Sequence, residues 1–487
     1  MQKKAVVIGA GFSGLSAAAY LAKSGYQVTV IEKNSSIGGR ARNFSSKDGF
    51  LFDMGPSWYW LPDVFENFFS DFGYKVEDFY ELKRLDPSYR VFFDDKHFDM
   101  PANLSELKNL FDSIENGAGA KLDEFLAEAK FKYNVAINDL VLKPGLSLTE
   151  FFDIKFLTGS LKGDLLCSIR KHVKKFFTSP YLQTIMEFPV LFLGATAQNT
   201  PALYSFMNYA DLGLGTWYPT GGMHKIVEAM QAICLEQGVQ FVLNETVKKV
   251  DFNDKTLYQI CSESNNYEAD IFVASCDYEH FDQSVLPSTH SNYSSKYWDK
   301  RTMSPSSLIF YLGINKKIKN IEHHNLFFDK SFDVHAHEIY EEPQWPSEPL
   351  FYVSATSKTD NTAPPGMENL FILVPVAAGL EDNEETREYY YEKVMQRLEK
   401  HTQEKIKEHV IYKKSYAHKN FQEDYNAFKG NAYGLANTLQ QTHMLKPSIK
   451  SKKFKNLFFT GQLTVPGPGV PPSIISGKVV AKEIAKT

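Results

Sequence analysis

The residues that decide the fold stand near the start of the chain: Ala5-Val6-Val7-Ile8-Gly9-Ala10-Gly11-Phe12-Ser13-Gly14. The run Ala5–Ile8 is short and apolar, which is typical of a strand buried on both faces. The glycines follow it with the spacing Gly-x-Gly-x-x-Gly, and Leu15, Ala18 and Leu21 then recur at helical spacing. The order of strand, glycine turn and helix predicts the phosphate-binding turn of a dinucleotide-binding fold.

Each glycine of this turn has its own physical task. Gly9 permits the tight turn, Gly11 lets a pyrophosphate approach the backbone, and Gly14 lets the helix pack close to the strand. The start of the helix adds unpaired N–H groups and the positive end of the helix dipole. Glu32 lies 18 residues after Gly14 at the end of a second strand, residues 27–31, where a carboxylate can bind a ribose diol. An acid at this position disfavours NADP and leaves NAD and FAD open.

A second glycine turn, Gly38-Gly39-Arg40, helps to distinguish FAD from NAD. The guanidinium of Arg40 offers a fork of donors that suits a pyrophosphate. The alternative is a plain turn that carries a surface arginine.

From this point the sequence resembles a known family. The pattern Glu32-(x5)-Gly38-Gly39-Arg40 is similar to the FAD fingerprint of the amine-oxidase-like flavoproteins. Four further segments resemble the bacterial phytoene desaturases in family order: Phe52–Tyr59, Tyr218–Met223, Asn426–Ala432 and Gly461–Pro471. The matches cover most of the chain and are least specific over residues 75–215. One departure is Val465, where the family often has a histidine.

The resemblance implies an FAD site and its residues. The pyrophosphate would be held by Gly9, Gly11, Gly14, Gly39 and Arg40, the adenosine ribose by Glu32, and the adenine side would meet Val247. The isoalloxazine ring would face Gly55, Pro56, Ser57 and Trp58, and would be covered by Gly461, Gly469, Val470 and Pro471. The loop 466–472 could instead be only a turn.

The pattern of strands and helices predicts an α/β protein with a discontinuous Rossmann-type FAD-binding domain. We assign this domain to residues 1–75, 216–290 and 430–487, because strand-and-glycine units of one kind recur there. Residues 76–215 are expected to form a largely helical lid or membrane-facing insert. Residues 291–429 are expected to form a mixed α/β substrate domain, with strands near 307–314, 349–355 and 370–375.

The resemblance implies an FAD-dependent carotenoid desaturase that converts phytoene to lycopene by successive hydride transfers, with oxygen or a quinone as the final electron acceptor. No catalytic group is evident, and only Arg170 and His172 are weak proton-handling candidates. Two alternatives stay open. One is a related carotenoid-modifying flavoenzyme, namely an isomerase, a later-step desaturase or a terminal-methyl oxygenase. The other is a non-catalytic lipid-binding protein on the same scaffold.

Composition limits the partners. The net charge of −5 gives no strong positive field for nucleic acid. The four cysteines form no Cys-x-x-Cys pair, which disfavours a zinc site and fits a reducing cytoplasm. His335 and His337 alternate as on one face of a strand, just after His323-His324. We interpret these four as solvated or hydrogen-bonded surface histidines and predict no metal.

Two features of the sequence bear on binding of a lipid-like substrate and on contact with a membrane. The chain contains 38 Phe, 26 Tyr and 5 Trp, 69 aromatic rings that make up 14% of it, and we expect a large share of them to line one elongated polyene cavity. Residues 165–177 carry an apolar helical face opposite Lys171, Lys174 and Lys175; the apolar residues are Leu165, Leu166, Ile169, Val173, Phe176 and Phe177. This pattern suits peripheral contact with the cytoplasmic membrane, and ordinary core packing is the alternative.

Overall fold

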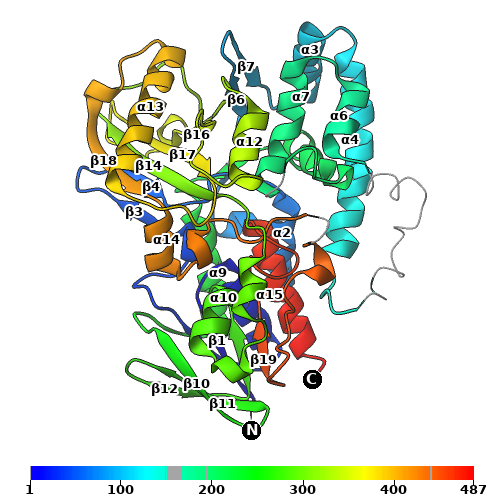
Figure 1. Cartoon of the computed structure of the whole chain (residues 1–487), viewed down its shortest axis with the longest axis vertical. Coiled ribbons are helices and arrows are strands. Elements are labelled where there is room, and N and C mark those ends of the chain that lie inside the picture. The colour runs from blue at the N-terminus through cyan, green and yellow to red at the C-terminus, as the bar shows by residue number, and fades with distance from the viewer. Residues whose placement is uncertain (1, 148–149, 151–166, 194–195, 439–440) are drawn as a thin grey trace.

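The computed structural model describes residues 2–147, 150, 167–193, 196–438 and 441–487. Figure 1 shows that the first strand of the chain and its last helix both lie in the lower half of the molecule. The upper half holds a large sheet on the left and a group of helices on the right.

A five-stranded parallel sheet forms the centre of the lower half. Its order is β19-β13-β1-β2-β9, so the first strand of the chain lies in the middle. Residues 5–8 are buried on both faces, as their apolar run predicts. The strands are β1 (Lys4–Ile8), β2 (Gln27–Ile31), β9 (Gln240–Val242), β13 (Ile271–Ala274) and β19 (Leu457–Phe459). The strands predicted from the sequence in this half are confirmed to within two residues at each end.

Three helices and a small antiparallel sheet complete this half. Helix α1 (Phe12–Lys23) packs against α9 (His224–Glu236) and α15 (Val470–Ile484). The small sheet consists of β10 (Val247–Asn253), β11 (Thr256–Ser262) and β12 (Asn266–Glu268). Helix α15 begins at Val470, inside the segment 466–472 that the sequence predicts to be a loop or a turn. Pro471 and Pro472 had indicated a loop, but proline is well tolerated in the first turn of a helix.

A seven-stranded sheet dominates the upper half, in the order β18-β14-β17-β16-β15-β6-β7. Its strands are β6 (Tyr89–Phe92), β7 (His97–Met100), β14 (Ser306–Ile314), β15 (His324–Phe327), β16 (Phe351–Ser354), β17 (Glu368–Val376) and β18 (Val410–Tyr416). Helix α13 (Glu384–Thr402) covers one face, where it packs on Leu308, Phe310 and Leu312. Ile309 and Tyr311 point the other way into the main core, so β14 is buried on both faces. The strands predicted near 307–314, 349–355 and 370–375 are confirmed.

The remaining elements include α2 (Pro62–Asp71), α3 (Leu104–Ile114), α4 (Ala118–Val135), α6 (Ile169–Phe176), α7 (Pro180–Glu187), α8 (Phe206–Asn208), α12 (Phe332–Tyr340), α14 (His418–Tyr425), and the shorter α10 (Tyr278–His280) and α11 (Ser295–Asp299). Of these, α3, α4, α6 and α7 lie at the upper right of Figure 1, whereas α14 lies at the left and α10 in the lower half. Four short strands also occur: β3 (Asn43–Ser45), β4 (Leu51–Asp53), β5 (Leu82–Arg84) and β8 (Trp217–Pro219). Helix α4 continues as a wider π-helical turn over Ala136–Leu140. The domain boundaries at 75, 215, 290 and 430 stay a prediction.

Helix α6 carries the proposed lipid-facing stripe. Residues 165–166 of that stripe lie outside the described part of the chain. Ile169, Val173 and Phe177 are fully buried, and Phe176 packs edge-on against Phe125. The apolar face that the structure describes is therefore used in internal packing. In the described ranges, no helix combines the length and the apolar composition that crossing a bilayer requires.

Candidate active site

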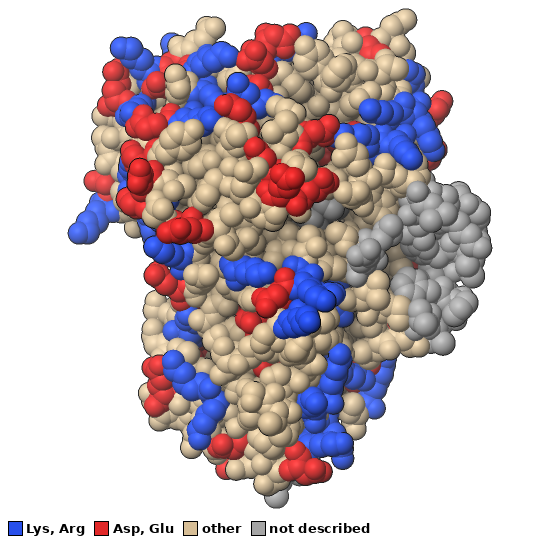
Figure 2. Space-filling model, viewed as in Figure 1, with Lys and Arg blue, Asp and Glu red and all other residues tan. Residues whose placement is uncertain are grey.

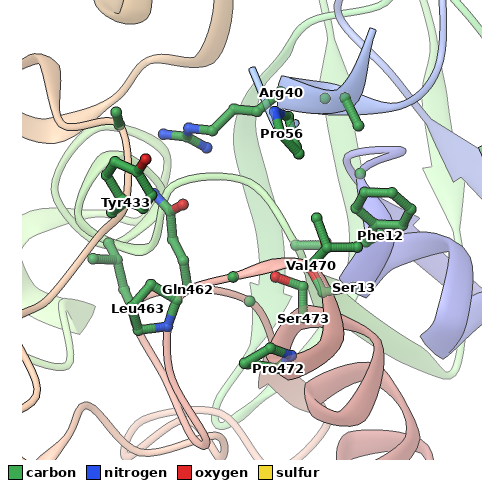
Figure 3. Close-up of a pocket in the computed structure, with 18 of the residues that line it drawn as sticks. Phe12, Ser13, Arg40, Pro56, Tyr433, Gln462, Leu463, Val470, Pro472 and Ser473 are labelled. Carbon is green, nitrogen blue, oxygen red and sulfur yellow. The ribbon is translucent and has the colours of Figure 1, made fainter. Parts of the chain in front are cut away.

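One continuous cavity of about 540 Å³ joins the lower sheet to the upper half of the molecule (Figure 3). Its wall comes from segments far apart in sequence, chiefly 8–13, 31–41, 54–61, 136–141, 203–207 and 460–475. Of the fifteen residues predicted to bind the cofactor, fourteen lie in this wall: Gly9, Gly11, Glu32, Gly39, Arg40, Gly55, Pro56, Ser57, Trp58, Val247, Gly461, Gly469, Val470 and Pro471. Their roles toward FAD stay predictions, but the fold brings them to one place.

The fifteenth residue, Gly14, is buried behind the wall. A Cβ atom on Gly14 would lie 2.0 Å from the carbonyl oxygen of Gly9, so only glycine lets α1 start this close to β1. The two glycine turns also approach each other. A Cβ on Gly39, whose φ is +55°, would lie 3.3 Å from the Cα of Gly11. Bare backbone therefore faces the cavity at the predicted pyrophosphate position.

Glu32 is held at one end of the cavity. It is only 5% exposed, and its Oε2 accepts a hydrogen bond of 2.8 Å from the N–H of Ala10. Its Oε1 accepts bonds of 2.9 Å from the backbone N–H and the side-chain amide of Asn34. These donors fix the carboxylate beside the first glycine turn. Its remaining lone pairs suit the hydroxyls of a ribose.

Arg40 projects into the cavity from the second glycine turn, as Figure 3 shows. Its Nη2 donates to the carbonyl oxygen of Asn431 at 3.1 Å, and its guanidinium carbon lies 4.9 Å from the ring centre of Tyr425. Burial lowers the pKa of Arg40, and the carboxylate of Asp277 opposes this effect. Among the described residues, nothing accepts a hydrogen bond from its buried Nε. A half-buried cation with a buried spare donor fits the diphosphate of FAD.

The predicted flavin-facing segment forms the next part of the wall. The hydroxyl of Ser57 donates to the carbonyl oxygen of Gly55 at 3.2 Å. The ring of Trp58 stacks on His324, with centroids 4.2 Å apart and planes at 12°. From the opposite side, α15 directs its N-terminus at the cavity through Val470 (Figure 3). The helix dipole there favours the electron-rich edge of a flavin ring.

Away from these groups the cavity is apolar. Its far wall contains aliphatic side chains from the end of α4 and from neighbouring segments: Leu61, Ala136, Ile137, Leu140, Val141, Leu203, Met207, Leu373 and Val465. Eleven described aromatic residues also line the cavity: Phe12, Trp58, Trp60, Tyr204, Phe206, Tyr278, Phe281, Tyr352, Phe421, Tyr425 and Tyr433. Most of the 69 rings pack in the cores instead. The expectation that a large share would line the cavity is wrong.

The two proton-handling candidates lie outside the cavity wall. Arg170 joins three helices, because its guanidinium pairs with Glu187 of α7 at 2.7 Å and with Asp333 of α12 at 2.6 Å. His172 is buried in the helical part, with its Nε2 3.3 Å from the Nζ of Lys132. Their positions suit a structural role.

The histidine interpretation needs correction. His335 and His337 lie on helix α12 and not on a strand. His323, His324 and His335 are buried, so only His337 of the four is a surface histidine. No cluster of possible metal ligands is found in the described residues. Sequence reasoning missed Tyr352 in the cavity wall and His324 behind it, because β15 and β16 bring together two residues that no motif connects.

Solved structures show which class of protein has this fold. An oxidoreductase from Methanosarcina mazei matches with a TM-score of 0.65 and 17% identity, over 98% of this chain and 100% of that one. Putrescine oxidase matches with a TM-score of 0.63 and 14% identity, over the full length of both chains. At these identities the likeness shows the fold alone. The chain therefore has the fold of these oxidoreductases.

Sequence relatives narrow this class. The family model of flavin containing amine oxidoreductases matches residues 12–485. A carotenoid 3,4-desaturase from Haloarcula japonica is 39% identical over 98% of this chain and 97% of that protein. A zeta-carotene-forming phytoene desaturase from Myxococcus xanthus is 28% identical over 99% and 94%. The chain belongs to the flavin-containing amine oxidoreductase family, and within it to the carotenoid desaturases. The prediction of an FAD-dependent carotenoid desaturase is thus confirmed.

Proposed function

We propose that this protein converts phytoene to lycopene by successive desaturations in carotenoid biosynthesis. The proposal rests on one observation, which is that a single cavity has one half suited to a dinucleotide and one half that is apolar. Arg40 and Glu32 give one half the chemistry of a dinucleotide site. The other half is walled by aliphatic residues such as Ile137, Leu140 and Leu203, which suit a long apolar chain. A polyene there would reach the flavin ring near Trp58.

The residues of the cavity suit this chemistry. FAD, when bound, supplies a ring that accepts a hydride. Loss of a hydride from an allylic carbon leaves a positive charge that is spread over the polyene. Aromatic faces such as those of Trp58, Tyr352 and Tyr433 attract a cation by roughly 0.5–2 kcal/mol each. The apolar wall excludes water, which would otherwise trap the cation.

A defined assay tests the proposal. Purified protein with FAD is incubated with phytoene in liposomes, aerobically or with an added quinone, and the products are separated and weighed by mass spectrometry. We expect red-shifted polyenes that have each lost two hydrogen atoms per new double bond. Unchanged phytoene under both conditions, with FAD bound to the protein, would refute this substrate.

A later-step desaturase is the second candidate. The relative at 39% identity is a carotenoid 3,4-desaturase, whereas the Myxococcus phytoene desaturase is 28% identical. The same liposome assay with lycopene as the substrate separates the two. A later-step enzyme would remove hydrogen from lycopene and leave phytoene intact. A phytoene desaturase would do the reverse.

We also propose that the protein works at the surface of the cytoplasmic membrane and passes electrons to oxygen or to a membrane quinone. The substrate is confined to lipid, so an enzyme outside the bilayer must meet it at the interface. Helix α6 exposes Lys171, Lys174 and Lys175. Figure 2 shows basic side chains gathered at the upper right, the side where Figure 1 places α6. Such a face suits anionic headgroups.

A further inference from the structure

A tyrosine and a histidine form a buried pair at the cavity wall. The Oη of Tyr352 on β16 and the Nδ1 of His324 on β15 lie 2.6 Å apart. His324 has no exposed surface, and its Nε2 has no hydrogen-bond partner among the described residues. Burial, and to a lesser degree His323 beside it, push the pKa of His324 well below its usual value. Burial therefore favours the neutral imidazole, which has one nitrogen lone pair to offer.

The pair lies next to the predicted flavin-facing segment. Tyr352 is part of the cavity wall, and His324 lies behind it, outside the wall. The ring of Trp58 stacks on His324 at 4.2 Å, which fixes the imidazole plane. Tyr352 is 5% exposed, so little solvent reaches it. The arrangement places a tyrosine of the cavity wall against a buried imidazole whose plane is fixed.

Desaturation needs such a group. Hydride transfer to the flavin removes one hydrogen with its electron pair, and the neighbouring carbon of the resulting cation must then lose a proton. A carbon acid next to a cationic centre is strongly acidic, so a weak base suffices if it is correctly placed.

We propose that Tyr352 and His324 together accept this proton. The C–H bond breaks, its electron pair becomes the new double bond, and the proton bonds to the Oη of Tyr352. In the same step the hydroxyl proton of Tyr352 passes to the Nδ1 of His324. The tyrosine stays neutral, and the positive charge passes to His324, from which the proton must leave before the next desaturation. This assignment rests on the proposed function, since it takes a carotenoid as the molecule oxidised.

Isotope labelling tests the role. Two phytoenes are prepared, one with deuterium at the carbon that loses the proton and one with deuterium at the hydride carbon. We expect Tyr352→Phe to slow formation of the desaturated product by about 100-fold, the lower end for a general base. We also expect its isotope effect to rise for the first label only, because proton removal becomes slow. His324→Asn keeps an acceptor near the Nδ1 position but cannot take a proton. We therefore expect it to change the rate and the isotope effect in the same way as Tyr352→Phe.

Controls separate this role from structural damage. Tyr390→Phe removes another buried hydroxyl, which donates to Pro346 at 2.7 Å outside the cavity, and should leave the rate unchanged. Each variant must first show a normal flavin absorption band. ¹⁵N NMR of the apoprotein gives a readout without turnover, and we expect an unprotonated Nδ1 on His324.

Three results would overturn the proposal. They are a His324→Asn variant with full activity, a protonated Nδ1 on His324, and an isotope effect that rises in His443→Asn but not in Tyr352→Phe. His443 also lines the cavity and is the rival acceptor. If wild-type protein desaturates no phytoene, the substrate proposal fails first, and the same labels are then placed on the carotenoid that it does oxidise.

Discussion

At the residue scale, the cavity depends on a few side chains whose charges are buried in the free protein. Arg40 illustrates the cost of this arrangement. Its guanidinium is desolvated, yet the described residues leave one of its donors without an acceptor. Such a group is unfavourable until an anion reaches it. The empty site is therefore less stable than the same site with a negatively charged ligand bound to Arg40.

Replacement of Arg40 should weaken FAD binding. Hydrogen bonds to charged groups contribute about 1.5–3 kcal/mol, so we expect Arg40→Ala to raise the Kd for FAD by roughly 10- to 100-fold. Arg40→Lys should fall between this variant and wild type, because it keeps the charge and loses the fork. Fluorescence titration of the apoprotein with FAD measures the change. Arg90→Ala is the matched control, because Arg90 pairs with Asp99 and neither residue lines the cavity. Equal losses in both variants would contradict this role of Arg40.

Asp211 should make stability depend on pH. It accepts a hydrogen bond of 2.7 Å from Tyr89, and burial raises its pKa to about 7. The unfolded chain has the lower, ordinary pKa, so the folded state binds the proton more tightly. Its contribution to stability is therefore complete at acidic pH and is lost as the pH rises from about 4 through 7. Urea unfolding across this range should show a smaller decline for Asp211→Asn than for wild type. Parallel declines in the two proteins would refute the assignment.

Residues were predictable from the sequence where spacing alone places them. Gly9, Gly11, Glu32 and Arg40 lie within one short strand–turn–helix–strand unit, so local geometry brings them together. Tyr352 was not predictable in this way. Its partnership with His324 depends on the pairing of β15 with β16, and the sequence does not encode that register in any local signal.

At the element scale, the predicted strands have a clear local sequence signal, and the strands that were missed lack one. Strands β14 and β17 are long and apolar, which identifies them as buried. Strand β15 is short and begins with His324, and β18 lies at the sheet edge with alternating exposed residues. Neither has the composition of a buried strand. Helix α6 shows the opposite problem, because an amphipathic pattern cannot state whether its apolar face meets the core or a lipid.

The basic face of α6 should control membrane binding. Lys171, Lys174 and Lys175 are replaced by glutamate, and binding to phosphatidylserine vesicles is measured by sedimentation at low salt. Each lysine near an anionic surface is worth about 1 kcal/mol, so we expect at least a 100-fold loss of binding. In the control variant, glutamate replaces Lys405, Lys407 and Lys413, which lie in strand β18 or just before it. Equal binding of both variants would show that α6 is not the contact.

At the scale of the whole molecule, the cavity is a junction between distant parts of the chain. Its wall takes residues from the first strand, from the end of α4, from β16 and from the segment before α15. A ligand that fills it contacts both halves of the protein at once. FAD should therefore act as an internal support as well as a reactant.

Removal of FAD should lower the melting temperature. A ligand at 100 times its Kd stabilises the folded state by about 2.7 kcal/mol, which predicts a shift of a few degrees for a chain of this size. Differential scanning fluorimetry of apoprotein with and without FAD measures it. ADP fills only the end near Glu32 and should give a smaller shift. If ADP and FAD stabilise equally, the flavin half of the cavity contributes nothing to stability.

The strand order has a consequence for biosynthesis. Strand β1 needs β13 beside it, about 265 positions later in the chain, and β13 needs β19, about 185 positions later again. At roughly 5–20 residues per second, the ribosome takes on the order of a minute to deliver the missing strands. During that time the apolar edge of β1 is without its final neighbour. The five-stranded sheet can therefore be completed only after β19 has been made, and the cavity residues that follow β19, such as Val470, come later still.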